Sequence, residues 1–368
     1  MRRALAHRAI RLRPRLARKP DCGRVQGGQP VLPHHMRPVG VFSLGRDALW
    51  WMTQHATCNP SCDVWLPEYC CPQAIDVFQR AGWTLQPYAL REDFTVDWEL
   101  FAESALGTGR GLLVLVDLLG YPCVVPEELR GDIRRSFRSV LRDCAQGLPT
   151  ANLSIETGQE EGLALFSLRK PFPIPDFAIL CSEDDPTLAS DSRGVGHAPG
   201  SRATSLRRSA FAQFESQLLR RPSISCIPGV QSVRRWLKRS SVLGQRPSTL
   251  SWRLSTGLDV QSAASARREH AAMLLEGLEG IALYKEVPVA AAPYYFPILV
   301  EEPARAMRRL RKHGVQCTAL WGGEGLWSNW SSVSVKASVE RLLCLPVHQE
   351  LSLEDVSRLR ALLHGVAS

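Results

Sequence analysis

Apolar positions along this chain follow two alternating periodicities from about residue 39 onward. Short continuous apolar runs, such as Leu112-Leu113-Val114-Leu115-Val116, predict strands that are covered on both faces, as in a parallel sheet. Between these runs, apolar residues three and four positions apart predict amphipathic helices. The predicted strands are 63–67, 83–89, 112–116, 139–143, 162–167 and 177–180, and the predicted helices are 47–57, 73–81, 98–106 and 126–137. This alternation predicts an α/β fold with a mostly parallel central sheet and helices on both faces.

The pattern changes after residue 181. Residues 182–256 are rich in Ser, Arg, Gly and Pro, which is typical of a connecting region, with amphipathic helices predicted at 205–219 and 230–237. The remaining predicted elements are helices at 259–278, 302–313 and 353–363 and strands at 290–300, 315–320 and 341–345. We therefore expect a large domain over 38–225 and a smaller C-terminal α+β domain over 226–368.

Charge separates the first 37 residues from the rest. The 368 residues carry a formal net charge of +9. Residues 1–37 hold ten Lys or Arg against the single acid Asp21, which accounts for all of it. The neutral body predicts no nucleic-acid partner. The leader is open to three interpretations: a basic disordered tail, a transit-like segment, or sequence upstream of a true start at Met36. We expect a non-structural leader whose removal leaves folding unchanged.

The cysteines and the apolar segments indicate a cytoplasmic protein. The chain has eleven cysteines, an odd number scattered through apolar stretches, which favours free thiols in a reducing compartment. No run of about 18 apolar residues is present, so no membrane span is expected. His55 with Cys58, Cys62, Cys70 and Cys71 is an alternative metal cluster. Its spacing matches no zinc motif well, and we expect no metal.

Two polar residues follow predicted strands and carry the clearest chemistry. Asp143 ends the strand 139–143, and Lys170 follows the strand 162–167. In an open α/β sheet, ligands bind beyond the carboxyl ends of the strands. A pyridoxal phosphate (PLP) site needs an amine to bind the cofactor and a carboxylate to keep its pyridine nitrogen protonated. Each residue also has a structural interpretation, Asp143 as a helix N-cap and Lys170 as a surface ion-pair partner.

Three further segments fit the same cofactor. The phosphate requires backbone N–H groups at a helix start, and Gly45-Arg46-Asp47 supplies one. Gln146, three residues after Asp143, is expected to bond the cofactor ring. Tyr69 is expected to approach the ring, with an aromatic at the edge of the core as the alternative.

Several segments resemble the DegT/DnrJ/EryC1/StrS family of sugar aminotransferases, PLP enzymes of fold type I. The resemblance covers about residues 38–365. Its motifs are the GRDAL phosphate loop at 45–49, DVWLPEY at 63–69, GYP at 120–122, DCAQ at 143–146, Phe166 and Lys170 on the F and K of S-F-H-x-x-K, and LPVHQELSLEDV at 345–356. The last block matches the family signature L-P-[LV]-[HY]-x-x-L-[ST]-x-E-[DE]-[VI].

The resemblance implies roles for individual residues. Lys170 would be the catalytic lysine that holds PLP, and Asp143 the partner of the pyridine nitrogen. Ser167 would replace the family's phosphate-contacting Ser, which aligns with Leu165, and Cys71 stands where an aromatic usually stacks on the ring. The cofactor-binding residues implied are Gly45, Arg46, Asp47, Tyr69, Cys71, Asp143, Gln146, Ser167 and Lys170.

The function implied is that of a homodimeric aminotransferase. It would move an amino group from an amino acid, by analogy glutamate, to a keto group of a nucleotide-linked sugar or related polyol. Phe177-Ala178 replace the family's Gly-Gly, Arg142 replaces a Glu, and Ser251-Trp252-Arg253 stands near the unrecognised N-Y-R-x-x-E segment. These departures favour an alternative, a PLP-fold protein with altered catalysis and a binding or regulatory role. The Asp143/Lys170 pair favours the enzyme.

Overall fold

The fold consists of two sheets with helices packed against them. The computed structural model describes residues 10–11, 32, 36–55, 63–107, 111–150, 162–183, 245–325 and 331–364. The helices predicted at 205–219 and 230–237, and the candidate metal ligands Cys58 and Cys62, lie outside these ranges. Within them, one sheet has seven strands and the other has two.

The seven-stranded sheet is mostly parallel, as predicted. Its strands are β1 (Met36–Phe42), β2 (Asp63–Pro67), β3 (Thr84–Tyr88), β4 (Leu112–Val116), β5 (Ser139–Asp143), β6 (Leu163–Ser167) and β7 (Ala178–Glu183). Their order is β1-β7-β6-β5-β4-β2-β3. The pairs from β3 to β6 are parallel, and only β7 runs antiparallel to its neighbours β6 and β1.

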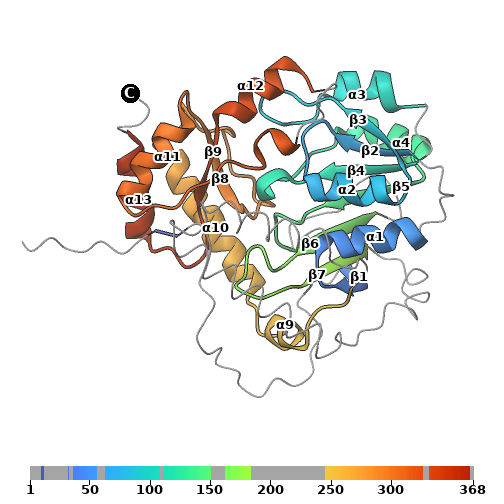
Figure 1. The fold of residues 1–368 in the computed structure, drawn as a ribbon, viewed down its shortest axis with the longest axis horizontal. Helices are drawn as coiled ribbons and strands as arrows, with labels where there is room; N and C mark the ends of the chain where they lie inside the picture. The colour runs from blue at the N-terminus through green and yellow to red at the C-terminus, as the bar shows by residue number, and fades with distance from the viewer. Residues whose placement is uncertain are drawn as a thin grey trace, which may run out of the picture.

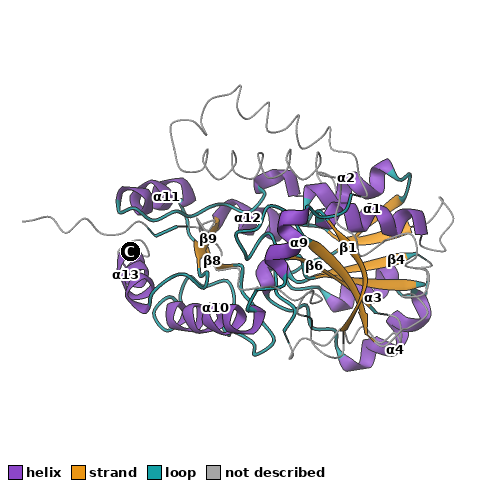
Figure 2. Ribbon diagram, turned by 90° about the horizontal axis from the view of Figure 1, so that it is seen from below, coloured by secondary structure: helices purple, strands orange, loops and turns teal. Residues whose placement is uncertain are grey.

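Helices cover both faces of this sheet because successive strand residues point to opposite sides. On one face, α1 (Gly45–His55) and α2 (Pro72–Arg80) pack on a buried cluster that includes Val64, Leu112 and Val114. On the other, α3 (Trp98–Ala105) and α4 (Glu127–Ser136) pack on a cluster that includes Trp65 and Leu113. Figure 2 shows the two helix pairs on opposite sides of the strands.

The C-terminal residues form a smaller unit around the antiparallel pair β8 (Tyr295–Leu299) and β9 (Leu342–Pro346). Its helices are α10 (Val260–Leu275), α11 (Pro303–Lys312), α12 (Val333–Arg341) and α13 (Leu353–His364), and α9 (Thr249–Ser255) precedes them (Figure 1). The prediction of a strand over 315–320 was wrong: Val315 and Thr318 make only isolated bridges. Helices α9 and α12 were not predicted from the sequence.

Parts of the basic leader pack against the body of the molecule. Met36 and Arg37, predicted to be non-structural, are the first residues of β1. Ile10 is 1 % exposed and lies in the core of the C-terminal unit, where it bridges Val315. The Arg11 carbonyl bonds the ring nitrogen Nε2 of His348 at 2.9 Å. These contacts disagree with the interpretation of residues 1–37 as wholly non-structural.

The pairing of the strands places the predicted site segments at the same end of the large sheet, where β5, β6 and β1 finish. Asp143, the last residue of β5, pairs with Val116 on one side and Leu165 on the other. Ser167 ends β6 and pairs with Ala178, which in turn pairs with Phe42 at the end of β1. The turn that contains Lys170 and the start of α1 therefore leave the sheet at the same edge as Asp143.

Candidate active site at the carboxyl edge of the large sheet

The structure brings Asp143 and Lys170 together at the ends of β5 and β6. Lys170 lies in a turn, and its N–H donates to the Ser167 carbonyl at 3.0 Å. The Ala145 N–H donates to Asp143 Oδ1 at 3.0 Å. Within the described residues, Oδ2 of Asp143 receives no hydrogen bond, so one carboxylate oxygen is available to a ligand. We call Asp143, Ser167 and Lys170 the β5–β6 end of the site.

The electrostatics of Asp143 reflect its enclosed position. Burial raises the pKa of its carboxyl above the ordinary value, because water no longer stabilises the charged form. The nearby Lys170 ammonium and the hydrogen bond from Ala145 act in the opposite direction, and the Asp117 carboxylate adds a smaller upward contribution. The lysine is therefore close enough to Asp143 to influence its titration.

Gln146 is bonded to the backbone of the turn after β4. Its Oε1 accepts a hydrogen bond from the Leu119 N–H at 2.8 Å, which fixes the turn after β4. Gly120 follows with a φ of +83°, and a Cβ there would lie 2.3 Å from the Ala292 carbonyl oxygen. Glycine is required at this position, since the C-terminal unit approaches the turn at backbone distance.

The start of α1 is capped by its own chain. The Leu44 N–H donates to Asp47 Oδ2 at 3.0 Å, and Asp47 is fully buried. An acidic residue in the first turn that bonds back to the preceding N–H stabilises a helix N-terminus. Gly45 and Arg46 form the same turn. We call residues 43–47 the α1 start. It forms the start of a helix, as expected, and it also contains the buried Asp47 carboxylate.

A second buried carboxylate lies beside the α1 start. Asp176 Oδ2 accepts from the Ser43 hydroxyl at 2.8 Å, and Oδ1 accepts from the Ser248 hydroxyl at 2.8 Å. The next residue, Phe177, has a φ of +148°, a region that favours glycine. This matches the Gly that the resemblance expects there. The Phe177 ring is buried and lies 5.9 Å from the Trp252 ring.

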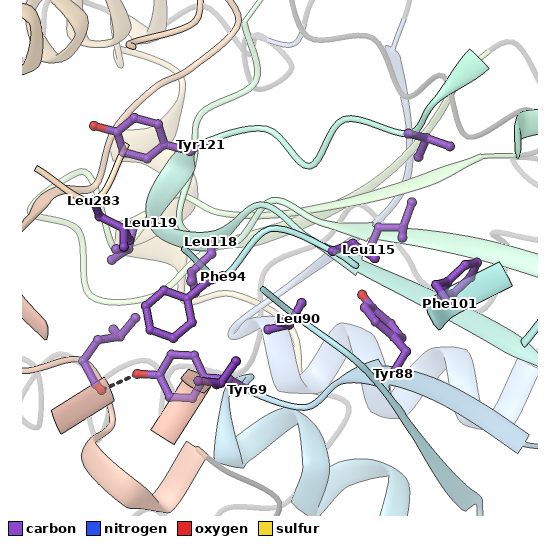
Figure 3. Close-up of a cluster of buried hydrophobic side chains, with 14 of the residues drawn as sticks. Tyr69, Tyr88, Leu90, Phe94, Phe101, Leu115, Leu118, Leu119, Tyr121 and Leu283 are labelled. Atoms are coloured by element: carbon purple, nitrogen blue, oxygen red, sulfur yellow. Dashed lines mark hydrogen bonds between the residues drawn. The ribbon is translucent and has the colours of Figure 1, made fainter. Parts of the chain in front are cut away.

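Tyr69 lies in the hydrophobic core of the large domain. It is 1 % exposed, and its ring centroid is 5.1 Å from that of Phe94. Its hydroxyl donates to the Leu320 carbonyl at 2.5 Å, as Figure 3 shows. The core interpretation therefore describes Tyr69 better than the cofactor-facing one. Cys71 is half-buried at the N-cap of α2, where its thiol makes no capping hydrogen bond.

A buried ion pair that was not predicted from the sequence joins the ends of β4 and β5. Arg142 Nε donates to Asp117 Oδ1 at 2.9 Å, and both side chains are nearly inaccessible. Asp117 also accepts from the Cys144 thiol at 3.3 Å and from the Cys123 N–H at 2.9 Å. Asp117 directly follows the apolar strand β4, the same signal that identified Asp143. The pair fixes the ends of β4 and β5 relative to each other.

Other site types find no support in the described part of the chain. No group of three or more His, Cys, Asp or Glu there could hold a metal ion. No helix among those residues is both long and apolar enough to cross a membrane. The cysteines described, including Cys70, Cys144 and Cys344, are free thiols.

The fold is that of the type I PLP-dependent aminotransferases, as comparison with solved structures shows. A DegT/DnrJ/EryC1/StrS aminotransferase from Brucella abortus superposes with a TM-score of 0.65 at 15% identity, over 91% of this chain and 87% of that one. DesV of S. venezuelae gives 0.63 at 17% identity, over 92% and 86%. The PLP form of Spr1654, described as a sugar aminotransferase of Streptococcus pneumoniae, gives 0.63 at 16%, over 89% and 86%.

Sequence comparison adds no closer assignment. No protein-family model matches the chain, and no curated protein matches it. The likeness to these solved structures therefore establishes the fold, and only the residues of the site indicate the function.

The residues present fit PLP well at one end of the site. At the β5–β6 end, Asp143 Oδ2 is unbonded within the described residues, and the Lys170 amine lies near it. This is the donor and acceptor set that a pyridine ring bearing an aldehyde requires. The α1 start would offer helix N–H groups to a phosphate, and the buried Asp47 carboxylate in the same turn would oppose a second negative charge there.

Proposed function

We propose that this protein is a PLP-dependent aminotransferase that acts on a keto sugar or a related polyol. The observation that carries the proposal is the Asp143 carboxylate beside the Lys170 amine at adjacent strand ends. The fold supports it, because its structural neighbours include sugar aminotransferases, one of them in a PLP form. By the same analogy the protein is a cytoplasmic homodimer, glutamate is the amino donor, and the acceptor is nucleotide-linked.

Each residue of the site has a chemical task in this reaction. PLP, when bound, supplies an aldehyde that links to amines and a ring that accepts electrons. Lys170 would hold it through Nζ, and Asp143 would keep a proton on the ring nitrogen through Oδ2. The Ser167 hydroxyl and the N–H groups of Gly45 and Arg46 would bind its phosphate. With its Nζ free as an amine, Lys170 would act as the base that takes a proton from the α-carbon of the amino donor, and then as the acid that delivers the same proton to the carbon that was the cofactor's aldehyde.

A second candidate function rests on the α1 start. Asp47 caps the helix that would receive the phosphate, and Gln146 and Tyr69 are engaged within the protein. These contacts favour a protein of this fold that binds PLP weakly and serves as a binding or regulatory partner.

A donor screen separates the two functions. Purified protein is incubated with PLP, and single amino acids are added in turn while the visible absorbance of the bound cofactor is followed. The aminotransferase predicts that at least one donor, glutamate first among them, removes this absorbance and releases its keto acid. Bound PLP that no donor converts would support the second candidate and contradict the first.

A further inference from the structure

Arg267 is the most deeply buried cation in the described part of the C-terminal unit. It lies on α10, is 1 % exposed, and belongs to the largest fully buried side chains of the protein. Burying a guanidinium is unfavourable unless its donors are satisfied, since the charge loses its hydration. Burial lowers the pKa of Arg267 to about 10, so the side chain is still charged at neutral pH.

The partners of Arg267 come from three separate segments of the chain. Its NH2 group donates to the Pro171 carbonyl and its NH1 group to the Pro293 carbonyl, each at 3.0 Å. Nε donates to Gln349 Oε1 at 2.9 Å. No carboxylate is among its hydrogen-bond partners in the described residues. A planar guanidinium can bond several acceptors in fixed directions, and here it joins these segments in one arrangement.

The first of these segments carries the candidate catalytic lysine. Pro171 directly follows Lys170, so fixing its carbonyl fixes the end of the turn that presents the lysine. Gln349 strengthens the same contact, because its Nε2 donates to the Pro171 carbonyl at 3.1 Å. Arg267 and Gln349 thus both donate to the Pro171 carbonyl, in the residue that follows Lys170.

The second segment, which contains Pro293, leads to the loop behind Asp143. The Tyr294 N–H donates to the Leu119 carbonyl at 2.7 Å, and the Ala292 N–H to the Gly120 carbonyl at 3.1 Å. Leu119 is in turn bonded by Gln146, three residues after Asp143. Arg267 therefore contacts segments that reach both the Lys170 turn and the loop behind Asp143.

We propose that Arg267 is a positioning residue that holds Lys170 in register with Asp143 by fixing the Pro171 carbonyl to the C-terminal unit. The inference rests on the proposed function, since it assigns Lys170 as the cofactor-binding amine. Its contacts with the protein can nevertheless be tested without any cofactor.

The first test is amide hydrogen exchange in the apo protein. The Lys170 and Phe172 N–H groups are bonded within the turn, to the Ser167 and Leu168 carbonyls. Arg267→Met should raise exchange at these two amides by roughly tenfold relative to the change in β4, because the turn loses its anchor. Arg267→Lys should restore protection in part, since an ammonium bonds fewer carbonyls. Arg268→Met is the matched control, because among the described residues the Arg268 side chain donates to the Ala291 carbonyl and not to the Lys170 turn.

The second test uses the PLP-loaded protein and follows the absorbance of the bound cofactor as a function of pH. Arg267→Met should shift the midpoint of this titration by roughly half a pH unit, because a displaced amine changes its contact with Asp143. If Arg267→Met does not fold, Gln349→Met takes its place in both tests, with a smaller effect of roughly threefold on exchange.

The possible results distinguish the positioning role of Arg267 from the proposed aminotransferase function. Exchange that rises equally in β4 and in the turn, with an unchanged titration midpoint, would reduce Arg267 to a structural residue and overturn the inference. An unchanged turn would overturn it as well. Wild-type protein that shows no cofactor absorbance at all would contradict the proposed function, while the exchange test would still decide whether Arg267 anchors the turn.

Discussion

The β5–β6 end and the α1 start both contain carboxylates, but their surroundings differ. Asp143 has one hydrogen bond, from Ala145, and a neighbouring ammonium. Asp47 bonds the N–H of Leu44, and Asp176 bonds the hydroxyls of two serines. Asp143 is only half-buried at the strand ends, so its carboxylate can still bond a ligand, whereas Asp47 and Asp176 are enclosed within the fold. The β5–β6 end is therefore arranged for a cofactor more clearly than the α1 start.

Replacement of Asp143 should give the largest effect on turnover. Asp143→Asn preserves the shape but does not hold a proton on the ring nitrogen, so we expect amino transfer to slow by about a hundredfold or more. The cofactor linkage to lysine should still form. Single-turnover kinetics with an amino donor measure this, with Asp97→Asn at the cap of α3 as control. An unchanged rate of amino transfer in Asp143→Asn would contradict a special role of the β5–β6 end relative to the α1 start.

Removal of Ile10 should weaken the C-terminal unit, whose Gln349 holds the Pro171 carbonyl at the β5–β6 end. Ile10 is fully packed in the C-terminal unit, and the adjacent Arg11 carbonyl bonds His348, the neighbour of Gln349. Ile10→Ala should lower the free energy of unfolding by about 2–4 kcal/mol, through lost burial and a residual cavity. Denaturant titration measures this value.

A chain that begins at Met36 tests the same contact. It should melt at a lower temperature than the full chain because it lacks Ile10 and Arg11. Equal melting temperatures would instead support the sequence-based interpretation of a leader without a structural role.

Neutralising Asp47 should make the α1 start more favourable for the cofactor and so more like the β5–β6 end. Asp47→Asn keeps an acceptor for the Leu44 N–H but removes a negative charge beside the expected phosphate. We predict that PLP binds about tenfold more tightly, since even a partly screened charge repulsion of this size is about 1.4 kcal/mol. Pyridoxal, which lacks the phosphate, should bind as before. Equal effects on both ligands, or none, would place the phosphate elsewhere; Asp259→Asn, at the cap of α10, is the control.

The smallest predicted effect is a pH dependence of apo stability at Asp143. Because the folded protein raises the pKa of this carboxyl, its contribution to stability is full below the ordinary value of about 3.9 and is lost as pH rises through the folded pKa. Asp143→Asn should therefore gain stability relative to wild type as the pH rises above the ordinary carboxyl value, because only the wild type loses this contribution. Urea titrations of both proteins at a series of pH values from about 4 upward measure the difference. A constant difference would contradict the direction of the shift.

The large sheet was predictable because local pattern decides it. Strands β4 and β5 have the predicted bounds, since continuous apolar runs are required where both faces are covered. The segment 315–320 has an apolar pattern but obtains only bridges, from Ile10 and Cys344. Helix α12 was missed because its Val and Ser residues have low helix propensity, and packing of Val335 and Val339 decides it.

The site was predictable only where it follows strand ends. Asp143 and Lys170 adjoin apolar strands, which local pattern reveals. The contact between Arg267 and Pro171 joins positions 96 residues apart, and no local pattern encodes it. The burial of Tyr69 against the Leu320 carbonyl likewise depends on the C-terminal unit.

The proposed role of Lys170, holding the cofactor beside Asp143, is tested most directly by borohydride reduction of the protein with PLP. Peptide mapping then locates the pyridoxyl label in wild type, Lys170→Ala and the control Lys336→Ala. We expect label on the Lys170 peptide in wild type and in Lys336→Ala, and none in Lys170→Ala. Label on a different lysine, or undiminished label in Lys170→Ala, would contradict it.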